Sequence, residues 1–64
     1  MWGEVRTAPN LMFARMWKDL FEGEGIPTRI LPADGSLVMA EEVAYKVYVP
    51  SDKVQVIEEI LRKI

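Results

Sequence analysis

The chain has 64 residues, no cysteine, no histidine and a formal net charge of −2, and half of its residues are hydrophobic. A chain of this length forms one domain, which we assign to residues 1–64, and its apolar content argues against disorder. Without cysteine or histidine there can be no disulfide, no zinc site with such ligands, no iron–sulfur cluster, no thiol nucleophile and no imidazole base. We therefore predict no metal and no cofactor.

Charge and hydropathy also narrow the class of partner. Ten acidic residues outnumber eight basic ones, whereas nucleic-acid-binding domains concentrate a basic excess on one face, so we expect no nucleic-acid partner. No apolar run approaches the ~20 residues that a helix needs to cross a bilayer. Glu4 and Arg6 interrupt the start of the chain and do not resemble part of a signal peptide. We expect a cytoplasmic protein without a membrane partner.

The first predicted elements are a strand and a capped helix. Glu4–Thr7 alternates polar and apolar residues, as a half-buried strand does. Asn10 is a good N-cap for a helix that begins at Leu11, because its side-chain oxygen can accept from the free N–H groups of the first turn. Gly25 suits the left-handed position after the helix, and Ile26 is expected to fold back onto the last turn.

The predicted helix is amphipathic, and its apolar side is wide. The core-facing residues recur at i, i+4, i+7 and i+8, and are Phe13, Trp17, Leu20 and Phe21. Further apolar residues widen the stripe to roughly half of the circumference at ~100° per residue, namely Met12, Ala14 and Met16. The predicted solvent side consists of Arg15, Lys18, Asp19 and Glu22. A stripe this wide exceeds what one small sheet can cover.

A second strand and a turn follow the helix. Thr28–Leu31 is the predicted strand, and Pro32 begins a turn in which Asp34 and Gly35 supply the positive φ. Leu37–Ala40 has the composition of a further short strand, which two glutamates then interrupt.

The last third of the chain predicts a strand and a helix. Tyr45–Val49 alternates regularly and is rich in residues that favour strands. Ser51 is expected to cap the final helix. The apolar stripe of that helix is formed by Val54, Ile57, Ile60, Leu61 and Ile64.

This order of elements predicts an α+β domain with a βαββα layout. A strand, a helix and a strand in succession form a right-handed crossover, so the first two strands should run parallel. Both amphipathic helices have to cover the same face of one three-stranded sheet. Tyr45–Val49 then lies between the other strands and antiparallel to both, which is the ferredoxin-like, split βαβ arrangement. Glu4–Thr7 is left at an unpaired edge.

Several short segments together resemble one known family. They cover joints between strands and helices as well as core positions, and are Val5 to Asn10, Ala14, Leu20, Gly25 to Pro27 and Val47 to Pro50. On these segments the chain resembles the prokaryotic signal-transducing protein family, small domains of unknown function. The resemblance implies a distant relation to PII-like signalling proteins and supplies no catalytic residues. The chain departs from the family pattern at Phe13, Trp17 and Phe21.

Met12 and Met16 are one helical turn apart, which is the spacing of a thioether clip for a soft metal. A Cu(I) site normally needs more thioethers or a cysteine, so packing at the edge of the core is the favoured interpretation. With Phe13, these residues extend the apolar stripe beyond the sheet, and exposed apolar patches mark interfaces. Met12, Phe13 and Met16 are therefore the favoured interface of a predicted homodimer, and the unpaired edge Glu4–Thr7 is the alternative interface. Association would also support so short a chain.

Alternation along the strands predicts a charged open face of the sheet. If the valines of the strands face the helices, the opposite face carries Glu4, Arg6, Arg29, Lys46 and Tyr48. Arg6, Arg29, Lys46 and Tyr48 could bind a small anionic effector or an acidic strip of a protein partner, through charge-assisted hydrogen bonds and stacking. A solvated face with cross-strand charge pairs is the simpler interpretation.

No arrangement of residues predicts catalysis. Glu41 and Glu42 are adjacent in a predicted loop, whereas an acid–base pair needs two carboxyl groups that converge on one bond. We expect a non-catalytic regulatory or interaction module. A sensor domain for a small anion or nucleotide, and a small enzyme or enzyme subunit, are the two alternatives, and the fold class does not choose among them.

Overall fold

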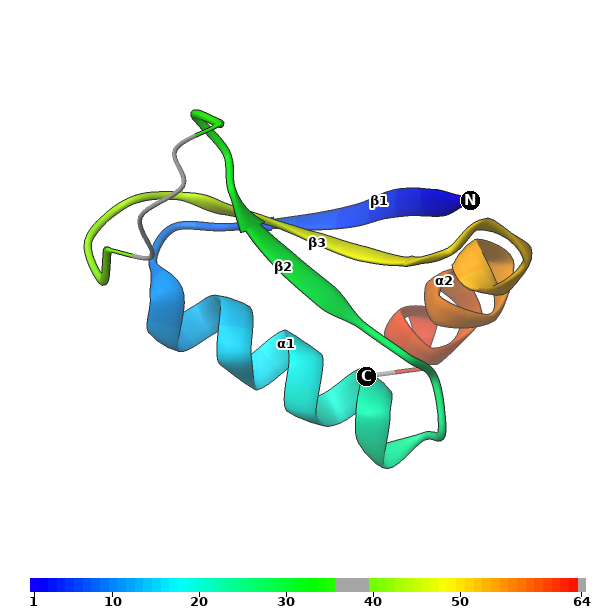
Figure 1. The fold of residues 1–64 in the computed structure, drawn as a ribbon. Coiled ribbons are helices and arrows are strands. Elements are labelled where there is room, and N and C mark those ends of the chain that lie inside the picture. Colours follow the sequence, from blue (N-terminus) through cyan, green and yellow to red (C-terminus); the bar gives the residue numbers. More distant parts are fainter. Residues whose placement is uncertain (36–39, 64) are drawn as a thin grey trace.

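The computed structural model describes residues 1–35 and 40–63 and has the predicted order of elements (Figure 1). Part of the predicted strand Leu37–Ala40 lies outside the described residues, and Ala40 itself is not in a strand. The elements are β1 (Trp2–Ala8), α1 (Leu11–Gly23), β2 (Arg29–Pro32), β3 (Tyr45–Pro50), a 3₁₀ turn (Ser51–Lys53) and α2 (Val54–Arg62).

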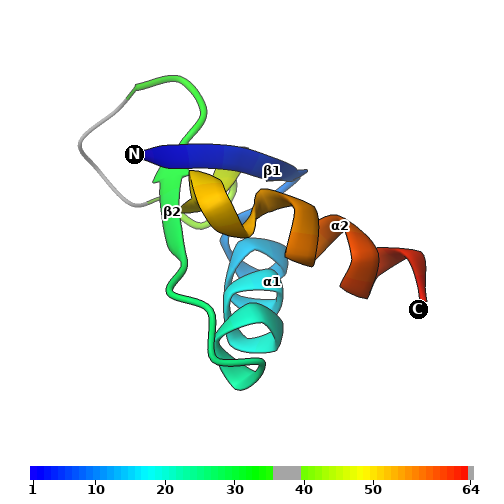
Figure 2. The same cartoon turned by 90° about the vertical axis from the view of Figure 1, so that its right-hand side faces the viewer.

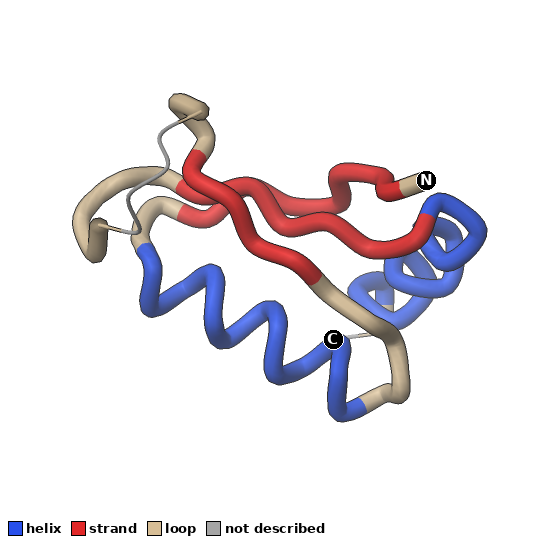
Figure 3. Tube along the Cα trace, viewed as in Figure 1, coloured by secondary structure: helices blue, strands red, loops and turns tan. Residues whose placement is uncertain are grey.

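The sheet has the order β1-β3-β2, and β3 is antiparallel to both neighbours. The prediction that Tyr45–Val49 forms the central strand is therefore confirmed, as is the parallel direction of β1 and β2. Both helices lie on the same side of the sheet (Figures 1 and 3). The view along the sheet shows α1 below the strands and α2 crossing beside β1 (Figure 2). The fold is the predicted α+β, split βαβ arrangement.

Both ends of α1 form as the sequence predicts. The Asn10 side-chain oxygen accepts a hydrogen bond from the N–H of Phe13 at 3.0 Å. At the other end Gly25 has a φ of 83°. The N–H of Gly25 donates to the carbonyl of Glu22 at 2.9 Å, and the N–H of Ile26 donates to the carbonyl of Phe21 at 3.0 Å. These two bonds are the Schellman motif, in which a left-handed residue satisfies the last carbonyl groups of a helix.

The predicted N-cap of the final helix is wrong. Ser51 opens the 3₁₀ turn, and α2 begins after Lys53 without a side-chain cap. The helical turn begins with Ser51 itself, whose N–H donates to the carbonyl of Met1 at 2.9 Å. This bond ties Ser51 to the start of β1, and the chain turns at once instead of extending into a cap.

The core lies between the sheet and the two helices, in two clusters. One cluster joins both helices to the centre of β3 and consists of Phe21, Ile26, Val47, Val49 and Ile57. The other lies under the start of α1 and consists of Ala8, Leu11, Ala14 and Tyr45. The Tyr45 ring is fully buried, and its hydroxyl donates to the carbonyl of Ala40 at 2.5 Å. Packing of Leu11 and Ala14 in this second cluster fixes which side of α1 faces the core.

Candidate functional site

The outward side of α1 is strongly apolar. The buried residues of α1 are Leu11, Ala14 and Phe21. At ~100° per residue, Met16 lies about 170° and Met12 about 150° around the helix axis from their mean direction. Met12 is 70% exposed and Met16 is 57% exposed. Two methionines of the predicted interface thus point almost directly into solvent.

Phe13 also lies on this surface. Its side chain is 44% exposed, so its predicted place on the core-facing side of α1 is wrong. The reason is the fully buried Tyr45, which packs with Leu11 and Ala14 under the first turns of α1, so these two residues and not Phe13 face inward there. Phe13 is then turned about 100° away from Ala14. The three residues of the predicted interface, Met12, Phe13 and Met16, are therefore all on the surface.

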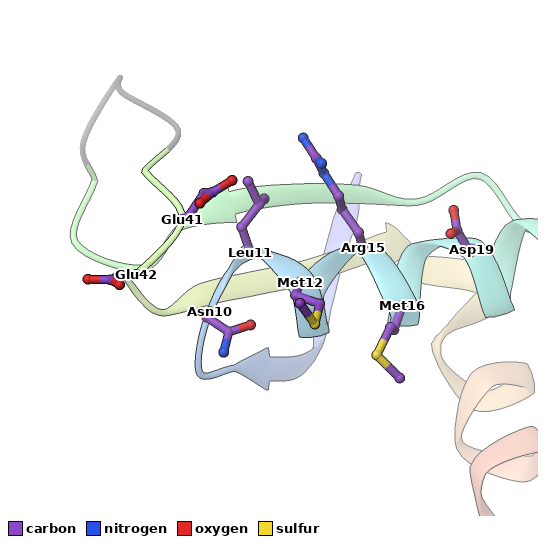
Figure 4. A pocket seen from close by; sticks show the side chains of 8 residues that line it. All are labelled: Asn10, Leu11, Met12, Arg15, Met16, Asp19, Glu41 and Glu42. Atoms are coloured by element: carbon purple, nitrogen blue, oxygen red, sulfur yellow. The ribbon is translucent and has the colours of Figure 1, made fainter.

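An open groove of about 460 Å³ lies beside Met12 and Met16, next to the loop that carries Glu41 and Glu42. Its apolar residues are Leu11, Met12 and Met16, and its charged residues are Arg15, Asp19, Glu41 and Glu42. The N–H of Leu11 donates to the carbonyl of Glu41 at 3.0 Å and holds the loop against the start of the helix. Met12 and Met16 project from the same side of the helix in the close-up view (Figure 4).

Two different flanks border the methionines. Arg15 and Asp19 lie on one flank, one helical turn apart, and Asp19 is nearer to the C-terminal end of α1. Phe13 and Leu20 lie on the other flank, at similar angles from the methionines. Phe13 is exposed, whereas Leu20 is partly buried and packs against the core. We call the surface formed by Met12, Phe13, Met16 and Leu20 the outward face of α1. It therefore has one charged border and one apolar border.

The open face of the sheet differs from the prediction at Arg6. β1 contains an irregularity between Glu4 and Arg6, so that Glu4 pairs with Tyr48 but Arg6 pairs with Val47. Residues directly opposite in an antiparallel pair share a face, which puts Arg6 on the side of the buried Val47. The prediction that Arg6 belongs to the open face is wrong. The cause is a β-bulge, which adds one residue to a strand and reverses the alternation beyond it.

The other predicted residues of the open face do lie together. Tyr48 and Lys46 alternate along β3 with buried valines, and Arg29 pairs with Tyr48. Lys46 Nζ lies 3.5 Å from Glu4 Oε1. Trp2 also lies beside these residues, since the Arg29 guanidinium carbon is 4.6 Å from the centroid of its ring. The alternation of Glu4, extended back by two residues, places Trp2 on the same face.

The described part of the chain gives little support for a metal site, a membrane span or a second binding site. Residues 1–35 and 40–63 contain no group of three acidic side chains arranged to hold a metal ion. No helix among them is long and apolar enough to span a bilayer. A second groove, of about 450 Å³, lies along α2 between Asp52 and Lys63. Its side chains come from the 3₁₀ turn, from α2 and from Lys63 directly after it, so the groove follows one continuous segment of the chain.

The chain matches no family model, no curated protein and no solved structure. The resemblance to the signal-transducing family therefore stays a prediction.

Proposed function

We propose that this protein is a non-catalytic interaction module that forms a homodimer through the outward face of α1. The observation that carries the proposal is the direction of Met12 and Met16, which point away from the core and are 70% and 57% exposed. Exposed apolar patches of this kind mark interaction sites. Methionine is also suited to such a surface, since its flexible thioether adapts to irregular contacts.

The pattern on α1 is complementary to itself when two copies pack antiparallel. A two-fold axis near Met16 brings Met12 of one copy toward Leu20 of the other. The same axis brings Arg15 of each copy beside Asp19 of its partner, because both residues lie on the same flank. Opposite charges meet on one border and apolar residues meet on the other.

A parallel dimer lacks this complementarity. If the two-fold axis ran along the helices, the charged border with Arg15 and Asp19 would face the apolar border with Phe13 and Leu20. The charges would lose solvent without gaining partners, which costs free energy. The charge pattern therefore supports the antiparallel arrangement.

The surface area of the chain also supports association. The chain exposes 4530 Å², whereas a folded monomer of its mass exposes about 4200 Å² by the usual scaling. A standard interface covers about 800 Å² on each partner, or roughly a sixth of this surface. The outward face of α1 is a candidate for that area, because Met12, Phe13 and Met16 are all exposed there.

Sedimentation velocity at tens of micromolar tests the proposal with two matched variants. Met16→Lys places a charge at the centre of the proposed interface and should give a folded monomer. Val56→Lys places the same charge at an apolar residue of α2 that is 44% exposed, and it should remain a dimer. Circular dichroism verifies that both variants fold. A wild-type monomer, or a dimeric Met16→Lys variant, would contradict the proposal.

Charge reversal tests the antiparallel arrangement separately. Arg15→Asp and Asp19→Arg should each weaken the dimer, because each places like charges side by side across the interface. The double variant restores opposite charges and should recover most of the affinity. A double variant that is weaker than both single variants would rule out the Arg15–Asp19 contact.

A further inference from the structure

The open face of the sheet carries aromatic rings and cations that the proposed dimer does not use. Both helices lie on the other side of the sheet (Figures 1 and 3), and no described element covers this one. Its residues stand in rows across the strands: Trp2 beside Pro50, Glu4 beside Tyr48 and Arg29, and Thr7 beside Lys46 and Leu31.

The Arg29 side chain is held across the sheet by Trp2. Arg29 belongs to β2 and Trp2 to β1, so the cation–π contact of 4.6 Å passes over the central strand. A cation–π contact of this kind is made by the charge of the guanidinium and does not require its N–H groups to donate hydrogen bonds to another residue. Within residues 1–35 and 40–63 the ion pair of this face is Lys46–Glu4, and Arg29 makes none. Its planar fork is thus positioned for a phosphate or carboxylate.

Lys46 supplies a second cation beside the same area. Its partner Glu4 is 3.5 Å away, and the two side chains are 39% and 43% exposed. An exposed pair of this kind contributes little free energy, so an incoming anion can take its place. Along β3, Lys46 and Tyr48 are two residues apart, which is about 6.7 Å. The two cations therefore flank one small area of the sheet.

The area between the cations offers contact for a flat ring. Tyr48 is half-buried and occupies the centre of its row, and Leu31 is 51% exposed in the next row. An aromatic ring and an aliphatic side chain on a flat sheet suit stacking with a planar aromatic group. A ligand for this face therefore combines a planar ring with an anionic group.

We infer that the open face binds a nucleotide-sized planar aromatic anion. Its ring would contact Tyr48 and Leu31, and its anionic group would bind Arg29 and Lys46. A single-stranded nucleic acid fits less well, because such strands need a continuous cationic groove. Here two cations share the face with Glu4, and the chain has a net charge of −2. Two cations and a net negative charge therefore favour a free nucleotide as the ligand of this face.

Amide chemical shifts of the ¹⁵N-labelled protein test this site with AMP as the probe. AMP at millimolar concentration should shift the amides of β1, β2 and the residues around Tyr48. Stacking of the base adds about 1–3 kcal/mol, so AMP should bind at least about fivefold more tightly than inorganic phosphate. Adenosine, which lacks the anion, should also bind more weakly than AMP.

Two arginine variants separate the site from general charge. Arg29→Gln removes the fork and should weaken AMP binding about tenfold or more. Arg62→Gln removes the same charge from an exposed position on α2 and should leave AMP binding unchanged. Equal affinity for phosphate and AMP would overturn the proposal, as would shifts outside the open face or binding of a short oligonucleotide without binding of AMP. Met16→Lys should bind AMP normally, which keeps this test independent of the dimer.

Discussion

The guanidinium carbon of Arg6 lies 5.7 Å from the ring centroid of Trp17, on the side of the sheet that the helices cover. This contact exists because the bulge in β1 turns Arg6 to the same side as Val47. Trp17 in turn stacks on the buried Phe21, with ring centroids 5.8 Å apart. The exposed Arg6 thus contacts one ring of an aromatic pair, Trp17, whose other ring, Phe21, lies in the core.

Arg6→Gln should lower the free energy of unfolding by about 0.5–1 kcal/mol, the usual contribution of an exposed cation–π contact. The same substitution in a Trp17→Leu background should have almost no effect, because the ring is then absent. Urea titration of the four proteins gives the coupling between the two side chains. Equal losses in both backgrounds would mean that Arg6 and Trp17 do not interact.

Local signals explain why the fold could be predicted from the sequence. Asn10 and Gly25 mark the two ends of α1 by residue type alone, since one caps N–H groups and the other adopts a positive φ. Tyr45–Val49 has the alternation and composition of a strand, and its central position follows from the connections. Each of these features depends on a few neighbouring residues.

The misplaced residues depend on contacts that the local pattern does not contain. The bulge beside Arg6 follows from pairing with β3, and no glycine in Glu4–Thr7 marks it. Phe13 fits the apolar period of α1, but the space beneath the helix is filled by Tyr45, which comes from a strand more than thirty residues later. The apolar periodicity identified the apolar residues of α1, but it could not show which of them lie in the core.

The two glycines at the end of α1 should respond to alanine in opposite directions. Gly25 has a φ of 83°, and a Cβ in this conformation costs about 1–2 kcal/mol. Gly23 is the last residue of α1, and a Cβ there would meet nothing within 4 Å. Gly23→Ala should therefore stabilise the protein by about 0.5 kcal/mol, whereas Gly25→Ala should destabilise it. Thermal unfolding, monitored by circular dichroism, measures the stability of both variants. A change in stability of the same sign in both would contradict the Schellman motif at the end of α1.

The close approach of α2 to β1 depends on the missing side chain of Gly3. Gly3 pairs with the buried Val49 and faces the helices. A Cβ at Gly3 would lie 2.7 Å from Cγ2 of Val54, in the first turn of α2. Two non-bonded carbon atoms do not come this close, so the Val54 side chain, the helix or the strand has to shift.

Gly3→Ala should therefore destabilise the protein by about 1–3 kcal/mol, the usual cost of overpacking. Val54→Ala alone should cost on the order of 1–2 kcal/mol, because it removes two methyl groups from a half-buried position. The double variant should cost clearly less than the sum, since the shortened Val54 side chain makes room for the new methyl group. Urea titration of the three variants and the wild type measures this coupling. Strictly additive losses would mean that α2 does not approach β1 at Gly3, and that Gly3→Ala acts through the strand alone.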